Sequence, residues 1–301
     1  MLKVAYSDIF KYEVPKRHRF PMQKYPMIAE RLVKEGTLTH DNFFAPQQLS
    51  EEEILTTHTP AYWENLKHQT LPPKDARVIG FAMTPRLVER ERYIAHATYE
   101  CALFAKEHGV SLNIAGGTHH AFADHGEGFC VLNDVALASN LLLGRGQARQ
   151  ILTVDLDVHQ GNGTAHLMAN EPRVFTFSMH GAKNYPFRKQ ASDLDIDLPN
   201  DTDDATYLAI LAETLPRLIE QIKPDMMFYQ SAVDVLASDK LGKLALTHEG
   251  CARRDAYVLT QAKAHNIPVA VVMGGGYSQN INEVVEAHCN TFRIAKAIFN
   301  T

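Results

Sequence analysis

The stretch from residue 151 to residue 163 reads Ile-Leu-Thr-Val-Asp-Leu-Asp-Val-His-Gln-Gly-Asn-Gly. Its first part, 151–156, is short, mostly apolar and rich in β-branched side chains, and this pattern predicts a buried β-strand. Its second part, 157–163, is polar and contains two glycines, which is typical of a loop. Ligands of open α/β sheets bind where the strands end, so we expect this loop to carry functional side chains.

Similar short apolar runs recur along the chain and alternate with longer amphipathic segments. The further predicted strands are 2–6, 111–115, 174–179, 226–229 and 269–273. The predicted helices are 84–108, 133–143, 204–222 and 247–265. Buried strands that alternate with helices predict an α/β fold, with a central mainly parallel β-sheet flanked by helices on both faces. Five of these strands are followed by loops that carry His, Asp or Tyr, and we expect those loops to meet at one edge of the sheet.

Composition narrows the class of protein. The 301 residues are 45% hydrophobic and 22% charged, as in compact folded proteins. No repeat, low-complexity tract or Gly/Ser-rich linker interrupts the chain, so we predict one domain over residues 1–301. The net charge of −5 offers no overall positive field for nucleic acid, which we do not expect as a direct ligand. Fifteen histidines allow metal chemistry, because histidine is the commonest metal ligand.

Cysteine use and hydropathy predict a location. The four cysteines are scattered without a C-x-x-C pair, so we expect reduced thiols rather than disulfides or a structural zinc site. The first residues lack the pattern of a secretory signal, and no apolar run approaches the roughly 18 residues of a membrane span. We therefore predict a cytoplasmic protein that does not bind membranes.

Acidic and histidine side chains alternate in the central segment. Asp155, Asp157 and His159 lie two residues apart, and since a strand has a period of two, we expect them to project to one side. Carboxylate and imidazole groups suit zinc, and a catalytic zinc takes three protein ligands and keeps one open position. Asp234, after the run 226–229, is the best candidate for a third ligand beside Asp157 and His159. The alternative is that these acids cap helices or accept backbone hydrogen bonds, but unpaired buried charge is costly.

Two adjacent histidines, His119 and His120, follow a pair of glycines that allow a tight turn. In a cleft they would repel each other if both were protonated, so their partners must set their charge states differently. Asp155 is placed to orient one of them and Asn162 the other. The alternative is an exposed surface pair, but the glycines on both sides favour a site.

The segment 274–277 reads Gly-Gly-Gly-Tyr. Alone it is a weak signal, since glycine triplets also serve ordinary turns and phosphate loops. In a site, glycines such as Gly275 would let the chain pass close to a ligand, and Tyr277 would direct its hydroxyl at a reacting carbonyl. Phe129 and Tyr185, taken alone, are more simply explained by packing.

Four motifs, in this order, resemble those of the zinc-dependent histone deacetylase superfamily, and the resemblance covers most of the chain. The motifs are Gly116-Gly117-Thr118-His119-His120-Ala121, Gly128-Phe129-Cys130-Val131-Leu132-Asn133-Asp134, 155–163 (Asp-Leu-Asp-Val-His-Gln-Gly-Asn-Gly) and 274–277. Segments 19–25 and 84–88, and Gln160 with Asn162, are similar to the class IV branch and its bacterial relatives. Asn162 stands where many members carry Asp, and a neutral amide raises the basicity of an imidazole less than a carboxylate does.

The resemblance implies a fold and a set of roles. The implied fold is a single three-layer arginase/deacetylase-type domain around a parallel sheet. The implied ligands of one Zn²⁺ per chain are Asp157, His159 and Asp234. The implied acid–base and oxyanion groups are His119, His120, Asp155, Asn162 and Tyr277. The implied substrate channel is walled by Gly128, Phe129, Tyr185 and Gly275. An implied K⁺ site uses Asp155, Asp157, His159, Ser178 and Met179.

The implied activity is zinc-dependent removal of an acetyl or longer acyl group from lysine side chains of a protein or peptide. Small acylated amines such as acetylpolyamines are the alternative substrates. A two-manganese ureohydrolase of the same fold class would need further carboxylates where this chain has Gly161, Ala232 and Leu236. A non-catalytic sensor of acylated ligands is expected to have lost a ligand, the base or the tyrosine, and none is missing here. The sequence leaves the oligomeric state open.

Overall fold

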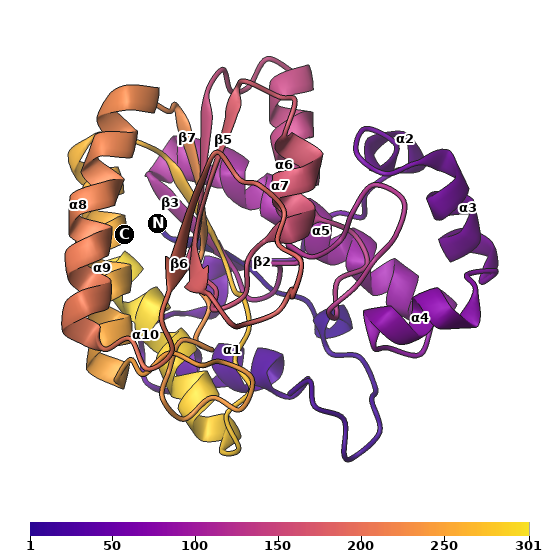
Figure 1. Ribbon diagram of the computed structural model, residues 1–301, viewed down its shortest axis with the longest axis horizontal. Coiled ribbons are helices and arrows are strands. Elements are labelled where there is room, and N and C mark those ends of the chain that lie inside the picture. The colour runs from indigo at the N-terminus through magenta and orange to yellow at the C-terminus, as the bar shows by residue number, and fades with distance from the viewer. Residues whose placement is uncertain (301) are drawn as a thin grey trace.

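An eight-stranded sheet crosses the centre of the protein, and every strand pair in it is parallel (Figure 1). The computed structural model describes residues 1–300. The strand order is β2-β1-β3-β8-β7-β4-β5-β6. The strands are β1 (Lys3–Ala5), β2 (Phe43–Phe44), β3 (Val110–Asn113), β4 (Ile151–Asp155), β5 (Val174–Gly181), β6 (Leu194–Leu198), β7 (Met226–Gln230) and β8 (Val269–Val272). The predicted α/β fold with a mainly parallel sheet is confirmed.

Helices cover both faces of this sheet. In Figure 1, α8, α9 and α10, with α1 below them, lie on one side and α5, α6 and α7 on the other. The helices are α1 (Lys24–Lys34), α2 (Glu51–Ile54), α3 (Pro60–His68), α4 (Pro73–Ile79), α5 (Pro85–His108), α6 (Asp134–Gly144), α7 (Asn162–Met168), α8 (Asp204–Ile222), α9 (His248–Ala264) and α10 (Ile281–Phe299). None of the helices within residues 1–300 combines the length and low polarity that crossing a bilayer requires.

The four central strands explain where a site can form. β3, β8, β7 and β4 are consecutive neighbours, and every residue in them is buried. Their side chains are mostly Val, Ile, Leu, Met and Phe, which favour a strand covered on both faces. The loops after these strands therefore lie beside one another, at the carboxyl edge of the sheet.

The predicted elements agree with the observed ones to within one or two residues at most ends, with two exceptions that matter. β4 ends at Asp155, so Asp157 and His159 lie in a loop, and the prediction that a strand pleat aligns them is wrong. Their backbone N–H groups donate to the carboxylates two residues earlier, Asp155 Oδ1 at 3.1 Å and Asp157 Oδ1 at 2.9 Å. These local hydrogen bonds replace pairing with a neighbouring strand and bend the chain.

The second exception is β5, which continues to Gly181. His180 therefore belongs to the strand rather than to a functional loop, and its Nδ1 lies 2.9 Å from Ser178 Oγ. The expectation that five strand ends deliver polar side chains to the site is wrong for this strand. The other four, β3, β4, β7 and β8, all deliver them.

Two strands went unpredicted for a physical reason. β2 has only two residues, and β6, which reads Leu-Asp-Ile-Asp-Leu, is an edge strand with mostly half-exposed side chains. Neither gives the continuous apolar run that identifies a buried strand. The four cysteines, Cys101, Cys130, Cys251 and Cys289, are all buried and free.

Candidate active site

Two loops bring together the three predicted metal ligands. Asp157 and His159 follow β4, Asp234 follows β7, and all three side chains are buried. One ligand atom from each lies within 4.8 Å of the other two. His159 Nδ1 is 2.9 Å from Asp157 Oδ1 and 3.2 Å from Asp234 Oδ2. The prediction that these three side chains converge is confirmed.

The donor set fits a divalent metal ion. Oδ2 of Asp234 is buried without a hydrogen-bond partner, although it lies close to His159. Burial raises the pKa of the Asp234 carboxyl to about 7, and the negative charge of Asp157 adds to this rise. Two buried carboxylates this close need a positive charge between them. A cation bound by two carboxylate oxygens and one imidazole nitrogen would supply it, and these are ligands that zinc accepts.

Gly275 allows the third loop to close over these ligands. Its N–H donates to Asp157 Oδ2 at 2.8 Å, and a Cβ at this position would collide with the Asp234 carboxylate. Only glycine leaves room for a backbone approach this close. The prediction that the glycine run brings the chain close to the site therefore holds for the candidate ligands themselves.

The histidine pair lies beside this cluster and has two different partners. His119 Nδ1 is 2.7 Å from Asp155 Oδ2, and His120 Nδ1 is 2.6 Å from Asn162 Oδ1. Burial lowers the pKa of both imidazoles, but the charges of Asp155 and Asp157 outweigh it and raise that of His119. The pKa of His120 falls well below its ordinary value, because His119 and His159 add to the effect of burial. The predicted division between a charged and a neutral histidine follows from these partners.

Two residues of the quoted motifs hold the histidine loop, a role the sequence did not reveal. Asp134, the first residue of α6, accepts hydrogen bonds from the backbone of Gly117 at 3.0 Å and of Thr118 at 2.8 Å. Asn133, the N-cap of α6, donates to the Ala121 carbonyl at 3.0 Å. The turn that presents the histidines is thus tied to the start of a helix on both sides.

A third histidine supports the same loop from behind. His58 Nδ1 is 3.0 Å from the Phe122 carbonyl, and Nε2 accepts a hydrogen bond from the Asn133 N–H at 3.1 Å. The ring must therefore be neutral, with its proton on Nδ1. Burial lowers the pKa of His58 to about 4.

This pKa predicts an acid-sensitive fold. The unfolded chain binds a proton at His58 near pH 6.5 and the folded one near pH 4, so stability is complete above pH 6.5 and is lost as pH falls between these values. From pH 6.5 to 5 the loss from His58 is about 2 kcal/mol. We expect His58→Gln to flatten the pH dependence of urea unfolding by this amount, whereas the exposed His40→Gln leaves it unchanged. Equal pH slopes for wild type and His58→Gln would contradict the assignment.

Asn162 continues the chain of contacts outward. It is the first residue of α7, and its Nδ2 donates to Glu127 Oε1 at 2.6 Å. Glu127 also accepts from the Tyr185 hydroxyl, whose pKa rises through burial and this neighbouring carboxylate. Glu127 was not predicted, although it directly precedes the quoted motif that begins at Gly128. A carboxylate therefore lies behind Asn162, one hydrogen bond farther from His120.

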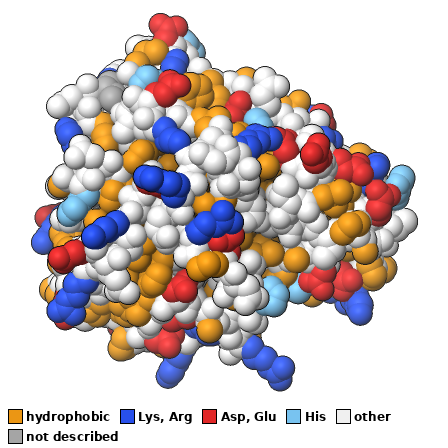
Figure 2. All heavy atoms as spheres, turned by 90° about the horizontal axis from the view of Figure 1, so that it is seen from above, with side chains coloured by type: hydrophobic (Ala, Val, Ile, Leu, Met, Phe, Trp, Pro, Cys, Tyr) orange, Lys and Arg blue, Asp and Glu red, His pale blue; other side chains and the backbone are white. Residues whose placement is uncertain are grey.

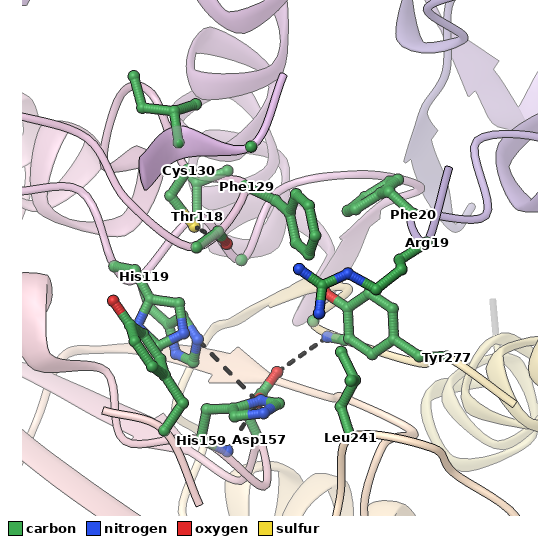
Figure 3. Close-up of a pocket in the computed structure, with 18 of the residues that line it drawn as sticks. Arg19, Phe20, Thr118, His119, Phe129, Cys130, Asp157, His159, Leu241 and Tyr277 are labelled. Atoms are coloured by element: carbon green, nitrogen blue, oxygen red, sulfur yellow. Dashed lines mark hydrogen bonds and ion pairs between the residues drawn. The ribbon is translucent and has the colours of Figure 1, made fainter. Parts of the chain in front are cut away.

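A cavity of about 470 Å³ opens onto these groups. The four predicted channel residues, Gly128, Phe129, Tyr185 and Gly275, all line it. Figure 3 shows Phe129, Phe20 and Tyr277 around the cavity, with His119, Asp157 and His159 gathered at one end. The ring centroid of Tyr185 is 5.0 Å from that of His120, edge to face. The channel prediction is confirmed as a location, and Phe20 adds a wall that was not predicted.

Tyr277 lines the cavity and is held by its backbone. Its N–H donates to Asp239 Oδ2 at 2.5 Å, and Asp239 Oδ1 accepts from the backbone of Leu241 and Gly242. Burial and the charges of Asp234 and Asp157 keep the pKa of the Tyr277 hydroxyl well above its ordinary value. This hydroxyl therefore stays protonated and is available as a donor.

The residues predicted for a K⁺ site share one part of the sheet. Ser178 pairs with Asp155 across the neighbouring strands β4 and β5, and Met179 follows it, fully buried. Asp155 Oδ1 is engaged by the Asp157 backbone and Oδ2 lies against His119. Potassium binding at this place stays a prediction.

A parallel α/β sheet whose central strand ends gather a candidate metal cluster, an acid–base pair and a tyrosine around one cavity defines an enzyme of hydrolytic type. Residues 18–292 match the family described as "Histone deacetylase domain". The chain belongs to this family and is accordingly a hydrolase of the deacetylase type.

Similar proteins support this family membership. An uncharacterized protein of Picosynechococcus sp. is 43% identical over 98% of this chain and 99% of its own length. Histone deacetylase 2 of Arabidopsis thaliana is 28% identical over 94% of this chain and 76% of its own. The crystal structure of the HDA15 HD domain covers 99% of this chain and 88% of its own, with a TM-score of 0.80 and 19% identity, and supports the fold.

Proposed function

We propose that the protein is a zinc-dependent deacylase that removes an acetyl or longer acyl group from lysine side chains of a protein or peptide. The observation that carries this proposal is the convergence of Asp157, His159 and Asp234 next to the His119–His120 pair, at the inner end of a lined cavity. Bound there, zinc would act as a Lewis acid toward the substrate carbonyl and would make water more acidic. The roles below extend the family's implied roles to these residues.

The acid–base work falls to His120. Its Nδ1 faces Asn162, which leaves Nε2 free to accept the proton of an attacking water and to return it to the leaving amine nitrogen. His119 carries positive charge that Asp155 balances, and it stabilises the negative charge that develops on the substrate. Tyr277 donates its hydroxyl hydrogen to the acyl oxygen as that oxygen becomes negative.

The channel walls position the acylated side chain. Phe20 and Phe129, whose ring centroids are 5.4 Å apart, present apolar surface to the methylene groups of a lysine. Excluding water there strengthens each electrostatic interaction at the reacting amide. Asn162 and Gln160 favour a class IV-like subtype, and the buried free cysteines favour a cytoplasmic location; both are part of the proposal.

A panel of substrates tests the proposal. Purified protein loaded with zinc is expected to release carboxylate from acetyl-lysine or longer acyl-lysine peptides, and a hydroxamate chelator is expected to abolish the release. N-acetylated polyamines, compared by kcat/KM, distinguish the small-amine alternative. Two manganese ions per purified chain, or no hydrolysis of any acyl-lysine peptide, would overturn the proposal.

Glu127 provides a finer test of the acid–base relay. Its carboxylate polarises Asn162 through a 2.6 Å hydrogen bond, and charged hydrogen bonds are about twice as strong as neutral ones. We expect Glu127→Gln to lower kcat about 5-fold with KM nearly unchanged, as losing roughly 1 kcal/mol from such a bond implies. In an Asn162→Ala background the same change is expected to have no further effect. Additive losses in this double-mutant cycle would show that Glu127 does not act through Asn162.

A further inference from the structure

The mouth of the cavity is lined by four cationic side chains. They are Arg19, before α1; Arg77, in α4; Lys183, after β5; and Lys243, before α9. All four are exposed. Because they come from four separate segments, their common location results from the fold and not from a local run of basic residues.

These cations are not balanced by nearby carboxylates. Within residues 1–300 none of the four forms an ion pair, and Asp157 at the inner end is the one acidic residue that lines the cavity. The acidic residues on neighbouring segments are engaged elsewhere, Glu127 with Asn162 and Asp239 with backbone N–H groups.

The positive mouth contrasts with the rest of the molecule. The chain as a whole carries a net charge of −5. Figure 2 shows the face at the end where the strands begin, and there blue basic and red acidic side chains lie interspersed. A positive rim on an acidic protein focuses its field on molecules that approach this cavity.

Arg19 lies deepest among the four in the view of the site. Figure 3 shows its side chain next to Phe129 and Tyr277, and its guanidinium carbon is 6.0 Å from the Phe129 ring centroid. A guanidinium can bind a carboxylate with two parallel hydrogen bonds. Lys243 Nζ donates to the Lys183 carbonyl at 2.9 Å, which links the two lysine-bearing loops.

Two apolar side chains complete the rim. Phe187 is 90% exposed and Val78 is 53% exposed, and both belong to the lining of the cavity or its mouth. A partner that covers them removes apolar surface from water, while its acidic groups meet the four cations. The chemistry of the rim therefore fits an extended segment with carboxylates beside the reacting residue.

We propose that this cationic rim selects acyl-lysine segments flanked by acidic residues, and disfavours lysine-rich segments and free polyamines. The inference rests on the proposed deacylase function and specifies its substrate. Its determinants are Arg19, Arg77, Lys183 and Lys243. Contact with flanking carboxylates strengthens substrate capture, so the selectivity appears in kcat/KM and in binding.

Three peptides with one central acetyl-lysine test the inference. Their flanking residues are Asp, Ala or Lys, and N-acetylspermidine is the fourth substrate. At low salt we expect kcat/KM for the Asp-flanked peptide to exceed that for the Lys-flanked peptide about 10-fold, since several exposed charge pairs each contribute a few tenths to 1 kcal/mol. At 0.5 M salt the ratio is expected to approach one, because screening weakens exposed charges. Fluorescence anisotropy with labelled peptides measures the same preference without turnover.

A charge-reversed rim provides the decisive comparison. Lys183→Glu/Lys243→Glu is expected to invert the preference between the Asp-flanked and Lys-flanked peptides, in both kcat/KM and binding. The matched control, Lys34→Glu/Arg253→Glu, changes the net charge equally at exposed positions outside the cavity lining and is expected to keep the wild-type preference. Circular dichroism and thermal unfolding check that both variants are folded.

The outcomes separate this inference from the function on which it rests. Equal kcat/KM for all three peptides, a wild-type preference for the Lys-flanked peptide or acetylspermidine, or inversion by the control variant would overturn the rim's role and leave the deacylase proposal standing. Failure to hydrolyse any of the peptides, including the Ala-flanked one, would overturn both.

Discussion

Tyr277→Phe is expected to lower kcat by about 100-fold or more, the scale seen when one oxyanion donor is removed. The hydroxyl lines the cavity beside the candidate metal ligands, and its raised pKa keeps it protonated. Its hydrogen bond gains most when the substrate oxygen becomes negative, so KM is expected to change little. Steady-state kinetics on the best acyl-lysine peptide measure both constants.

The matched control removes a hydroxyl outside the cavity. Tyr257 lies on α9 and donates to the Ala212 carbonyl at 3.2 Å, so Tyr257→Phe is expected to leave kcat within about 2-fold, as is usual for surface changes. Zinc content and thermal unfolding of Tyr277→Phe should match wild type, because this side chain is not a ligand. Unchanged turnover of Tyr277→Phe would mean that another group stabilises the acyl oxygen.

The candidate site could be predicted because its residues mark strand ends with unusual chemistry. Asp157, His159 and Asp234 are polar groups that follow buried apolar runs, and a parallel sheet brings such positions to one edge. Order along the chain was enough for this, since topology and not local geometry assembles the cluster. The pleat argument for Asp157 and His159 failed, yet their convergence with Asp234 did not depend on it.

What sequence could not show are the side chains that act through another residue. Glu127, Asp239 and His58 carry no distinctive spacing, and each contacts residues from a distant segment. Their contribution depends on which loops meet, which a single sequence does not specify. The same limit applies to the rim, because Arg19 and Lys243 are 224 positions apart and meet only in the folded chain.

Asp234→Asn is expected to remove zinc binding and to lower activity by more than about 100-fold, since changes that merely disturb a ligand's hydrogen bonds already cost 10- to 100-fold. The substitution keeps the shape of the side chain and removes a buried negative charge. Metal analysis after dialysis is expected to find zinc in wild type and little in the variant. Added zinc is expected to raise the thermal midpoint of wild type only, because binding to the folded state alone stabilises it.

The metal-free proteins should show the opposite order of stability. Without a cation, Asp234 and Asp157 repel each other across a buried site, and burial already raises the pKa of Asp234 to about 7. The uncharged amide removes this repulsion, so we expect metal-free Asp234→Asn to be more stable than metal-free wild type by about 1 kcal/mol or more at pH 8. Asp41→Asn, at an exposed position, is the control and is expected to bind zinc normally. A cluster that evolved only to support the fold would instead lose stability with Asp234→Asn both with and without zinc, and that result would exclude the metal site.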